Sequence, residues 1–188
     1  MKIETLVQAI SFLLEQKGGS LDKLSLLKLI FFADKYHMMK YARSITNDTY
    51  YAMKYGPVAS NVKNILDFDF LSEDEKEYVE KYLVKNDNQI DIKEKFKKYN
   101  MLSETDKEAL KFAYENFGKY KAFDLVDITH KFYEWKRFKK SLENGLTREK
   151  ILEEDFFKFT DIENDPYKKH IPEELVKLSQ EFYFGKVI

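Results

Sequence analysis

The sequence lacks cysteine altogether, and it contains only 6 glycines and 3 prolines among its 188 residues. Without cysteine the chain forms no disulfide, offers no thiolate nucleophile and holds no sulfur-ligated zinc ion, which agrees with a reducing compartment. The small share of glycine and proline favours regular secondary structure over long loops. Stability must therefore come from packing.

An excess of charge of one sign is also missing. The 32 Lys and Arg residues are balanced by 33 Asp and Glu residues, which leaves a net charge of -1. A nearly neutral chain has no bulk attraction for nucleic acid or for an anionic membrane. Binding to either would need a local patch.

Long hydrophobic runs are absent as well. The longest uncharged stretch, residues 5–14, is shorter than the roughly 20 apolar residues that cross a bilayer. The opening segment carries Glu4 and shows no small-residue cleavage site of a secretory leader. We therefore expect a cytoplasmic protein that does not enter a membrane.

Apolar residues are plentiful: hydrophobic residues make up 44% of the chain and aromatic residues 16%. This length and composition fit one domain, and we expect residues 1–188 to form a compact, mainly α helical bundle with a small β-hairpin or short strands. Apolar periodicity and capping signals predict the helices. They are expected over residues 3–14, 21–41, 57–66, 72–86, 103–117, 123–130 and 133–142, from about 147, and from 172.

Three local signals refine these boundaries. Ser20 is a plausible N-cap for the second helix. Residues 44–55 are rich in β-branched and aromatic residues, and Tyr51, Met53 and Tyr55 alternate with Ala52 and Lys54, which predicts a short strand or hairpin arm. Gly56 and Pro57 are expected to end it, with Pro57 opening the next helix. Residues 90–100 fit either a strand or a charged helix.

The residues that most enzymes require are scarce. The chain has no spaced-glycine loop with lysine for phosphates and no Gly-x-Ser-x-Gly turn. Its histidines are His37, His130 and His170. Asp34 and His37 share a helix face, but two ligands do not close a metal site, and an internal hydrogen bond is the commoner use of such a pair. We expect no catalysis, no cofactor and no metal.

One segment interleaves cations with aromatics. Residues 131–140 read KFYEWKRFKK, a composition that single-stranded nucleic-acid binders use for stacking and phosphate contact. At helical spacing, however, Trp135 and Phe138 share one face and the cations the other, which equally describes a core stripe under a solvated surface. The second reading carries more weight, so nucleic acid is not an expected partner.

Two blocks carry a family resemblance. Residues 26–37 (LLKLIFFADKYH), 45–48 (ITND) and 51–58 (YAMKYGPV) form the first, and residues 102–104, 117–118 and 129–135, with Thr129-His130 before Trp135, form the second. In order and spacing they resemble the Panacea domain of SocA-like antitoxins, which also includes GepA-like phage-associated proteins. The resemblance covers about residues 5–138 and leaves residues 139–188 as a helical extension packed on the domain.

The sequence departs from the family pattern at a few positions. Asn47 replaces the usual glycine, Met53 replaces an aromatic residue, and residues 132–134 replace the usual short approach to Trp135. Asn is the best substitute for glycine in a left-handed turn, so Asn47 preserves the geometry.

The resemblance implies an antitoxin that neutralises a cognate protein toxin by direct binding, in a toxin-antitoxin system of the kind linked to phage defence. An adaptor that delivers the toxin to a protease, and a nucleic-acid-binding regulator, are the alternatives, and a homo-oligomer is open. Two sets of residues are of interest. The candidates for partner binding are Tyr51, Tyr55, Gly56, Pro57, His130 and Trp135, and motif residues with an expected structural role are Asp34, His37, Thr46 and Asp48.

A purely structural reading exists beside the functional one. Tyr55, Gly56 and Pro57 could simply join a strand to the next helix. Residues 143–188 lie outside the resemblance, and we expect them to hold the contacts that are specific to one toxin.

Overall fold

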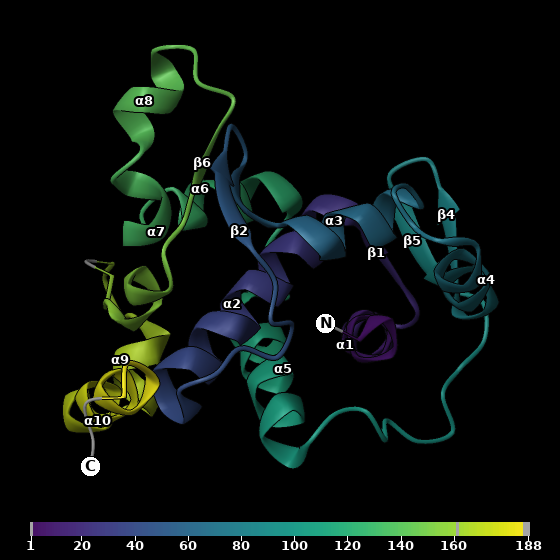
Figure 1. Cartoon of the computed structure of the whole chain (residues 1–188), viewed down its shortest axis with the longest axis horizontal. Coiled ribbons are helices and arrows are strands. Elements are labelled where there is room, and N and C mark those ends of the chain that lie inside the picture. Colours follow the sequence, from purple (N-terminus) through teal and green to yellow (C-terminus); the bar gives the residue numbers. More distant parts are fainter. Residues whose placement is uncertain (1, 161, 186–188) are drawn as a thin grey trace.

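Helix α2 (Lys23–Tyr41) runs through the middle of the molecule, as the computed structural model of residues 2–160 and 162–185 shows (Figure 1). Every residue from Ser25 to Met39 is buried, so this helix forms the centre of the core. The helix begins two residues later than predicted, because the side chain of Asp22 accepts a hydrogen bond from the Ser25 backbone N–H at 2.8 Å. Ser20, the predicted N-cap, lies instead in a short strand.

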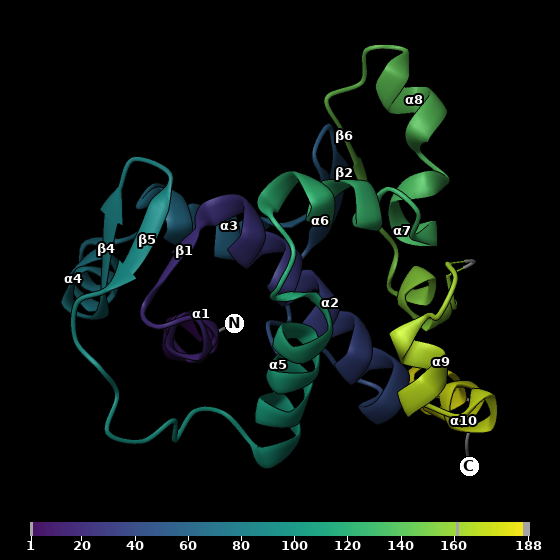
Figure 2. The same ribbon diagram turned by 180° about the vertical axis from the view of Figure 1, so that it is seen from behind.

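The mainly α fold with short strands is confirmed. The remaining helices are α1 (Ile3–Gln16), α3 (Ser60–Asp67), α4 (Glu73–Tyr82), α5 (Glu104–Phe117), α6 (Ala122–Thr129), α7 (Tyr133–Lys136), α8 (Lys139–Glu143), the 3₁₀ helix η1 (Glu153–Phe157), α9 (Pro166–His170) and α10 (Glu173–Tyr183). Helices α1, α3, α5, α6, α10 and η1 contact α2, and α5 packs alongside it (Figure 2).

Two antiparallel sheets flank the helices. The first has the strand order β1-β5-β4 and the second β3-β2-β6. Their strands are β1 (Ser20–Asp22), β2 (Tyr50–Met53), β3 (Gly56–Ala59), β4 (Leu83–Asn86), β5 (Gln89–Ile92) and β6 (Arg148–Lys150). The sequence of residues 90–100 fitted either a strand or a charged helix. In the structure, residues 89–92 form a strand, and no helix follows up to residue 100.

Three boundary predictions are wrong. Pro57 does not open a helix: it lies in edge strand β3 opposite Ala52, where a missing backbone N–H is tolerated, and α3 starts at Ser60. The helix capped by Ser72 ends at Tyr82 rather than near residue 86. Residues 148–150 pair with β2 as a strand instead of starting a helix, because strand pairing depends on distant partners that local periodicity does not report.

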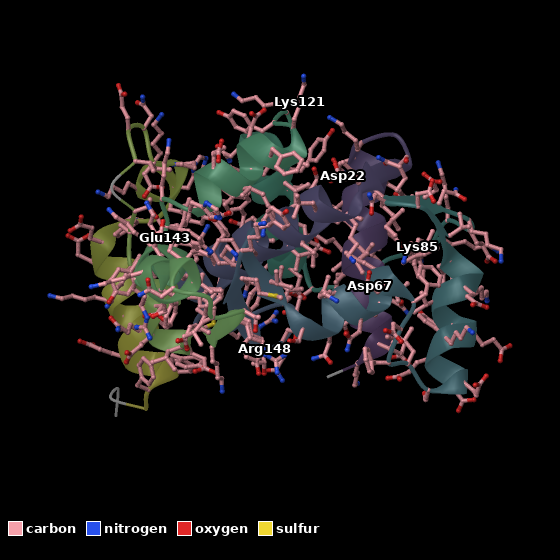
Figure 3. All side chains as sticks on the ribbon, turned by 90° about the horizontal axis from the view of Figure 1, so that it is seen from above. Asp22, Asp67, Lys85, Lys121, Glu143 and Arg148 are labelled. Carbon is pink, nitrogen blue, oxygen red and sulfur yellow. The ribbon has the colours of Figure 1, made fainter. Side chains whose placement is uncertain are left out.

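An ionic cluster ties the first sheet to the helices. The Asp67 carboxylate at the end of α3 accepts hydrogen bonds from Lys23 of α2 and from Lys63, and Lys85 of β4 lies 3.9 Å away. Figure 3 shows Asp67 and Lys85 close together, far from Glu143. At this end of the molecule lie α4, β4 and β5, while α9 and α10 occupy the other end (Figure 1).

The segment after residue 138 contributes to the core. Tyr167 of α9 is fully buried, and its hydroxyl donates to the backbone oxygen of Phe32 at 3.0 Å. Phe156 of η1 is buried against Phe31 of α2, with ring centroids 5.8 Å apart. Within the described residues, no helix has the length and apolar character needed to span a bilayer.

Candidate partner-binding site

The turn between β2 and β3 is built around Gly56. Its φ of +96° is a conformation that L side chains rarely adopt. A Cβ at this position would lie 2.5 Å from Thr129 Oγ1 and 2.8 Å from Lys28 Nζ. Gly56 therefore lets the turn sit directly on α2 and α6.

Below the turn lies a lysine with no exposed surface. Lys28 of α2 is 0% exposed, and its ammonium group donates to the backbone oxygen of Pro57 at 2.9 Å. Burial lowers the pKa of Lys28 to about 7, because the charged form loses its hydration. This contact fixes the turn to the central helix.

Beside the turn, the rings of His130 and Trp135 stack, with centroids 3.6 Å apart and an interplanar angle of 12°. Trp135 is 6% exposed, and its indole N–H donates to the backbone oxygen of Met53 at 2.7 Å. Burial and the nearby charge of Lys28 lower the pKa of His130. The neutral imidazole is therefore favoured. The stacked rings lie next to the turn.

Exposed apolar side chains lie around the turn and the ring stack. Tyr55 is 47% exposed, Phe123 of α6 is 67% exposed, and their rings meet edge to face at a centroid distance of 6.2 Å. Leu146, which is 52% exposed, lines a neighbouring cavity of about 610 Å³. The cavity is lined by Lys54, His130, Trp135, Lys139, Leu142, Glu143, Leu146 and Thr147. We call Tyr55, Phe123, Leu146 and this cavity the turn face.

Five of the six candidate binding residues come together here, from the turn after β2, from β3, from the end of α6 and from α7. Gly56 and Pro57 are buried and shape the turn, whereas Tyr55 is open to a partner. Tyr51 stands apart: it lies further along β2, and the Arg148 guanidinium of β6 covers its ring at 4.9 Å.

Sequence reasoning missed Phe123 and Leu146. Both were available only as apolar residues near helix ends, a signal that does not separate a core contact from a surface one. Their exposure depends on how α6 and the segment after α8 fold back beside β2.

The motif residue Asp34 sits inside the molecule. Its carboxylate accepts hydrogen bonds from Ile45 N at 2.7 Å, from Thr46 N at 3.1 Å, from the Thr46 hydroxyl, and from the Tyr50 hydroxyl at 2.7 Å. Burial nevertheless raises the pKa of Asp34 to about 6. In the same loop Asn47 has φ +48°, so the left-handed turn predicted for it is confirmed.

Asp48 and His37 also bond internally. Asp48 accepts from the backbone N–H groups of Asn61 at 2.8 Å and Val62 at 3.0 Å, and so caps the start of α3. His37 contacts the backbone oxygen of Arg43 at 2.7 Å and Thr105 Oγ1 at 3.0 Å. Across the described residues, no three His, Asp or Glu side chains converge as a metal site would require.

Two of the four rings in the basic and aromatic segment are buried. Phe132 is 0% exposed and Trp135 is 6% exposed, and Glu134 between them is buried in an ion pair with Lys35 at 2.6 Å. Lys131, Lys136 and Lys139 stay at the surface. The cations therefore lie on a solvated face over a core stripe, and the two buried rings cannot stack on bases.

A protein with an exposed aromatic turn on a helical scaffold, in which Asp34, His37 and Asp48 bond internally, fits a binding module. Comparison with family models gives a match to residues 26–136, described as antitoxin SocA-like, Panacea domain. The chain therefore belongs to the SocA-like Panacea-domain antitoxin family, as its motifs led us to expect. No curated protein and no solved structure gives a significant match to the chain.

Proposed function

We propose that this protein is a cytoplasmic antitoxin that neutralises a cognate toxin by direct, non-covalent binding through the turn face. Exposed Tyr55, Phe123 and Leu146 beside one cavity carry the proposal. Large aromatic side chains supply much of the energy at protein interfaces, where a few central residues dominate affinity. Membership of the family supports a toxin as the partner.

The attachment of the β2–β3 hairpin to the helices also supports binding. Lys28 holds Pro57, and Trp135 holds Met53, so both strands of the hairpin are fixed to helices. A surface that is already ordered loses little conformational entropy when a partner docks. The protein acts by contact and makes or breaks no covalent bond.

The test uses the product of the adjacent gene as the candidate toxin. Expressed alone it should arrest growth, and co-expression of this protein should restore growth. The double variant Tyr55→Ala/Leu146→Ser should weaken the purified complex about tenfold or more, measured by calorimetry. Phe70→Ala is the matched control, because Phe70 is 82% exposed on the loop between α3 and α4.

Two outcomes would redirect the proposal. An adaptor for proteolysis would shorten the half-life of the toxin in a pulse-chase experiment, whereas an inhibitory complex leaves it unchanged or longer. The antitoxin role is abandoned when the neighbouring product is harmless and no growth inhibitor co-purifies with the chain.

A further inference from the structure

The C-terminal helix carries a second exposed apolar surface. Leu178 is 53% exposed, Phe182 is 68% exposed and Phe184 is 44% exposed, all within seven residues of chain. A concentration of large apolar side chains in water is unusual for a protein surface without a partner. Helix α10 and the segment before it lie outside residues 26–136, the part that the family shares.

Two faces of α10 are apolar. Val176 is 4% exposed and Ser179 is 5% exposed, and this face packs on α2 and η1. Leu178 and Phe182 lie four residues apart on the solvent-facing side, where they form a separate exposed stripe, whereas Leu175 at its edge is partly buried against the core. Since the helix is already anchored by its first face, the stripe is not needed to hold α10 in place.

The border of the stripe is acidic. Glu174 and Glu181 are both exposed, and each lies three or four residues from Leu178, so they border the stripe on the same side. Lys177 lies between them on the same side, so the border carries two negative charges and one positive charge. Such a border attracts an apolar segment that carries Lys or Arg beside its anchor residues, and it repels an acidic one.

We propose that this α10 stripe (Leu178 and Phe182, bordered by Glu174 and Glu181) docks a basic amphipathic segment of the partner toxin. The inference rests on the function proposed above and adds a second contact with a stated chemistry. A second copy of this chain fits less well. Packing two α10 stripes together would bring the glutamate borders of both copies into the same interface.

The binding chemistry can be tested without the toxin. The probe is a fluorescein-labelled helical peptide of about 18 residues, roughly five turns, with Leu on one face and Lys on both borders. Its counterpart has Glu at every Lys position. Fluorescence anisotropy with the full-length protein should show the Lys peptide binding about tenfold tighter than the Glu peptide.

Two variants locate the binding on α10. Leu178→Ser/Phe182→Ser should weaken binding of the Lys peptide about tenfold, and Phe70→Ser is the apolar control that should not. Glu174→Gln/Glu181→Gln should reduce the preference for Lys over Glu, whereas Glu73→Gln/Glu77→Gln on α4 should leave it intact. Circular dichroism verifies that each variant is folded.

Several results would overturn the inference. These are equal binding of both peptides, no binding of either, or binding that survives the Leu178 and Phe182 changes. A dimer in sedimentation that the same changes convert to a monomer would assign the stripe to a second copy. If the Leu178→Ser/Phe182→Ser variant loses the peptide but still restores growth, the toxin is not the occupant. Failure of the antitoxin role itself shows separately, as absence of growth rescue by the unmodified protein.

Discussion

The ammonium nitrogen of Lys28 lies 2.9 Å from the carbonyl oxygen of Pro57, and the Cα of Gly56 passes so close that an added Cβ would meet the same nitrogen at 2.8 Å. The hairpin turn and the central helix are thus in contact where the family motif reads Tyr-Gly-Pro. A residue with a side chain at position 56 would have to push the turn away from α2. The exposed position of Tyr55 depends on this contact.

Gly56→Ala should therefore be costly in two ways. The positive φ of +96° disfavours any L side chain, and the new methyl group would clash with Lys28 and Thr129. We expect a loss of about 2 kcal/mol or more in the free energy of unfolding, measured by urea denaturation. Gly145→Ala is a matched control: its φ is +98°, but nothing lies within 4 Å, so it should lose only about 1 kcal/mol. Equal losses would contradict the close-contact explanation.

Burial of Lys28 should make stability depend on pH. Its pKa falls from 10.5 to about 7 in the folded protein, so between these values the unfolded chain binds more protons. Stability from this group therefore rises as pH increases from 7 toward 10.5, and the burial penalty is largest below pH 7. Lys28→Met lacks this slope. The stability lost on that substitution should be greater at pH 9.5 than at pH 6.5, and Lys76→Met, on the exposed face of α4, is the control.

Asp34 should respond to pH in the opposite sense. Its folded pKa of about 6 exceeds 3.8, so the folded protein binds more protons between these values, and the contribution to stability falls as pH rises through this window. Asp34→Asn should remove that dependence. It should also lose roughly 3 kcal/mol, because an amide N–H₂ would face hydrogen-bond donors of the 45–50 segment. Tyr50→Phe, which removes one donor to Asp34, should lose about 1 kcal/mol.

Local signals account for the parts of the fold that sequence could predict. The capping boxes at Ser72 and Ser103 mark the starts of α4 and α5 because both partners lie within one turn. Strand β6 could not be predicted in this way, since Arg148 pairs with Met53, far away in sequence. The candidate site shows the same division. The family motif pointed to Tyr55 and Trp135 as candidates, but the exposure of Phe123 and Leu146 follows from tertiary packing alone.

The extension also explains why removing residues 143–188 is a poor test of partner specificity. Phe156 and Tyr167 fill the core beside α2, so that deletion would expose the interior as well as remove α10. Point changes on the exposed side of α10 avoid this problem. They separate loss of a binding surface from loss of the fold.

One buried lysine joins α2 to α7 through an ion pair and to the extension through backbone hydrogen bonds. Lys35 Nζ lies 2.6 Å from Glu134 Oε1, both side chains are 0% exposed, and the same nitrogen donates to the backbone oxygens of Phe156 at 3.1 Å and Lys158 at 2.6 Å. Lys35→Met leaves the carboxylate of Glu134 buried without its cation, so we expect a loss of about 3–5 kcal/mol. The double variant Lys35→Met/Glu134→Met removes both charges and should lose clearly less.

Limited proteolysis reports whether the loss is local. Because Lys35 holds the backbone of η1 and the segment after it, Lys35→Met should speed cleavage within residues 143–160 about tenfold or more, while cleavage elsewhere changes less. Glu134→Gln is the intermediate case: it keeps a hydrogen-bond acceptor for Lys35 but removes the charge, so Lys35 loses its buried counterion. If Lys35→Met and the double variant lose equal stability, the ion pair is not what fastens the extension. The two backbone oxygens, left unpaired in both variants, would then carry the effect.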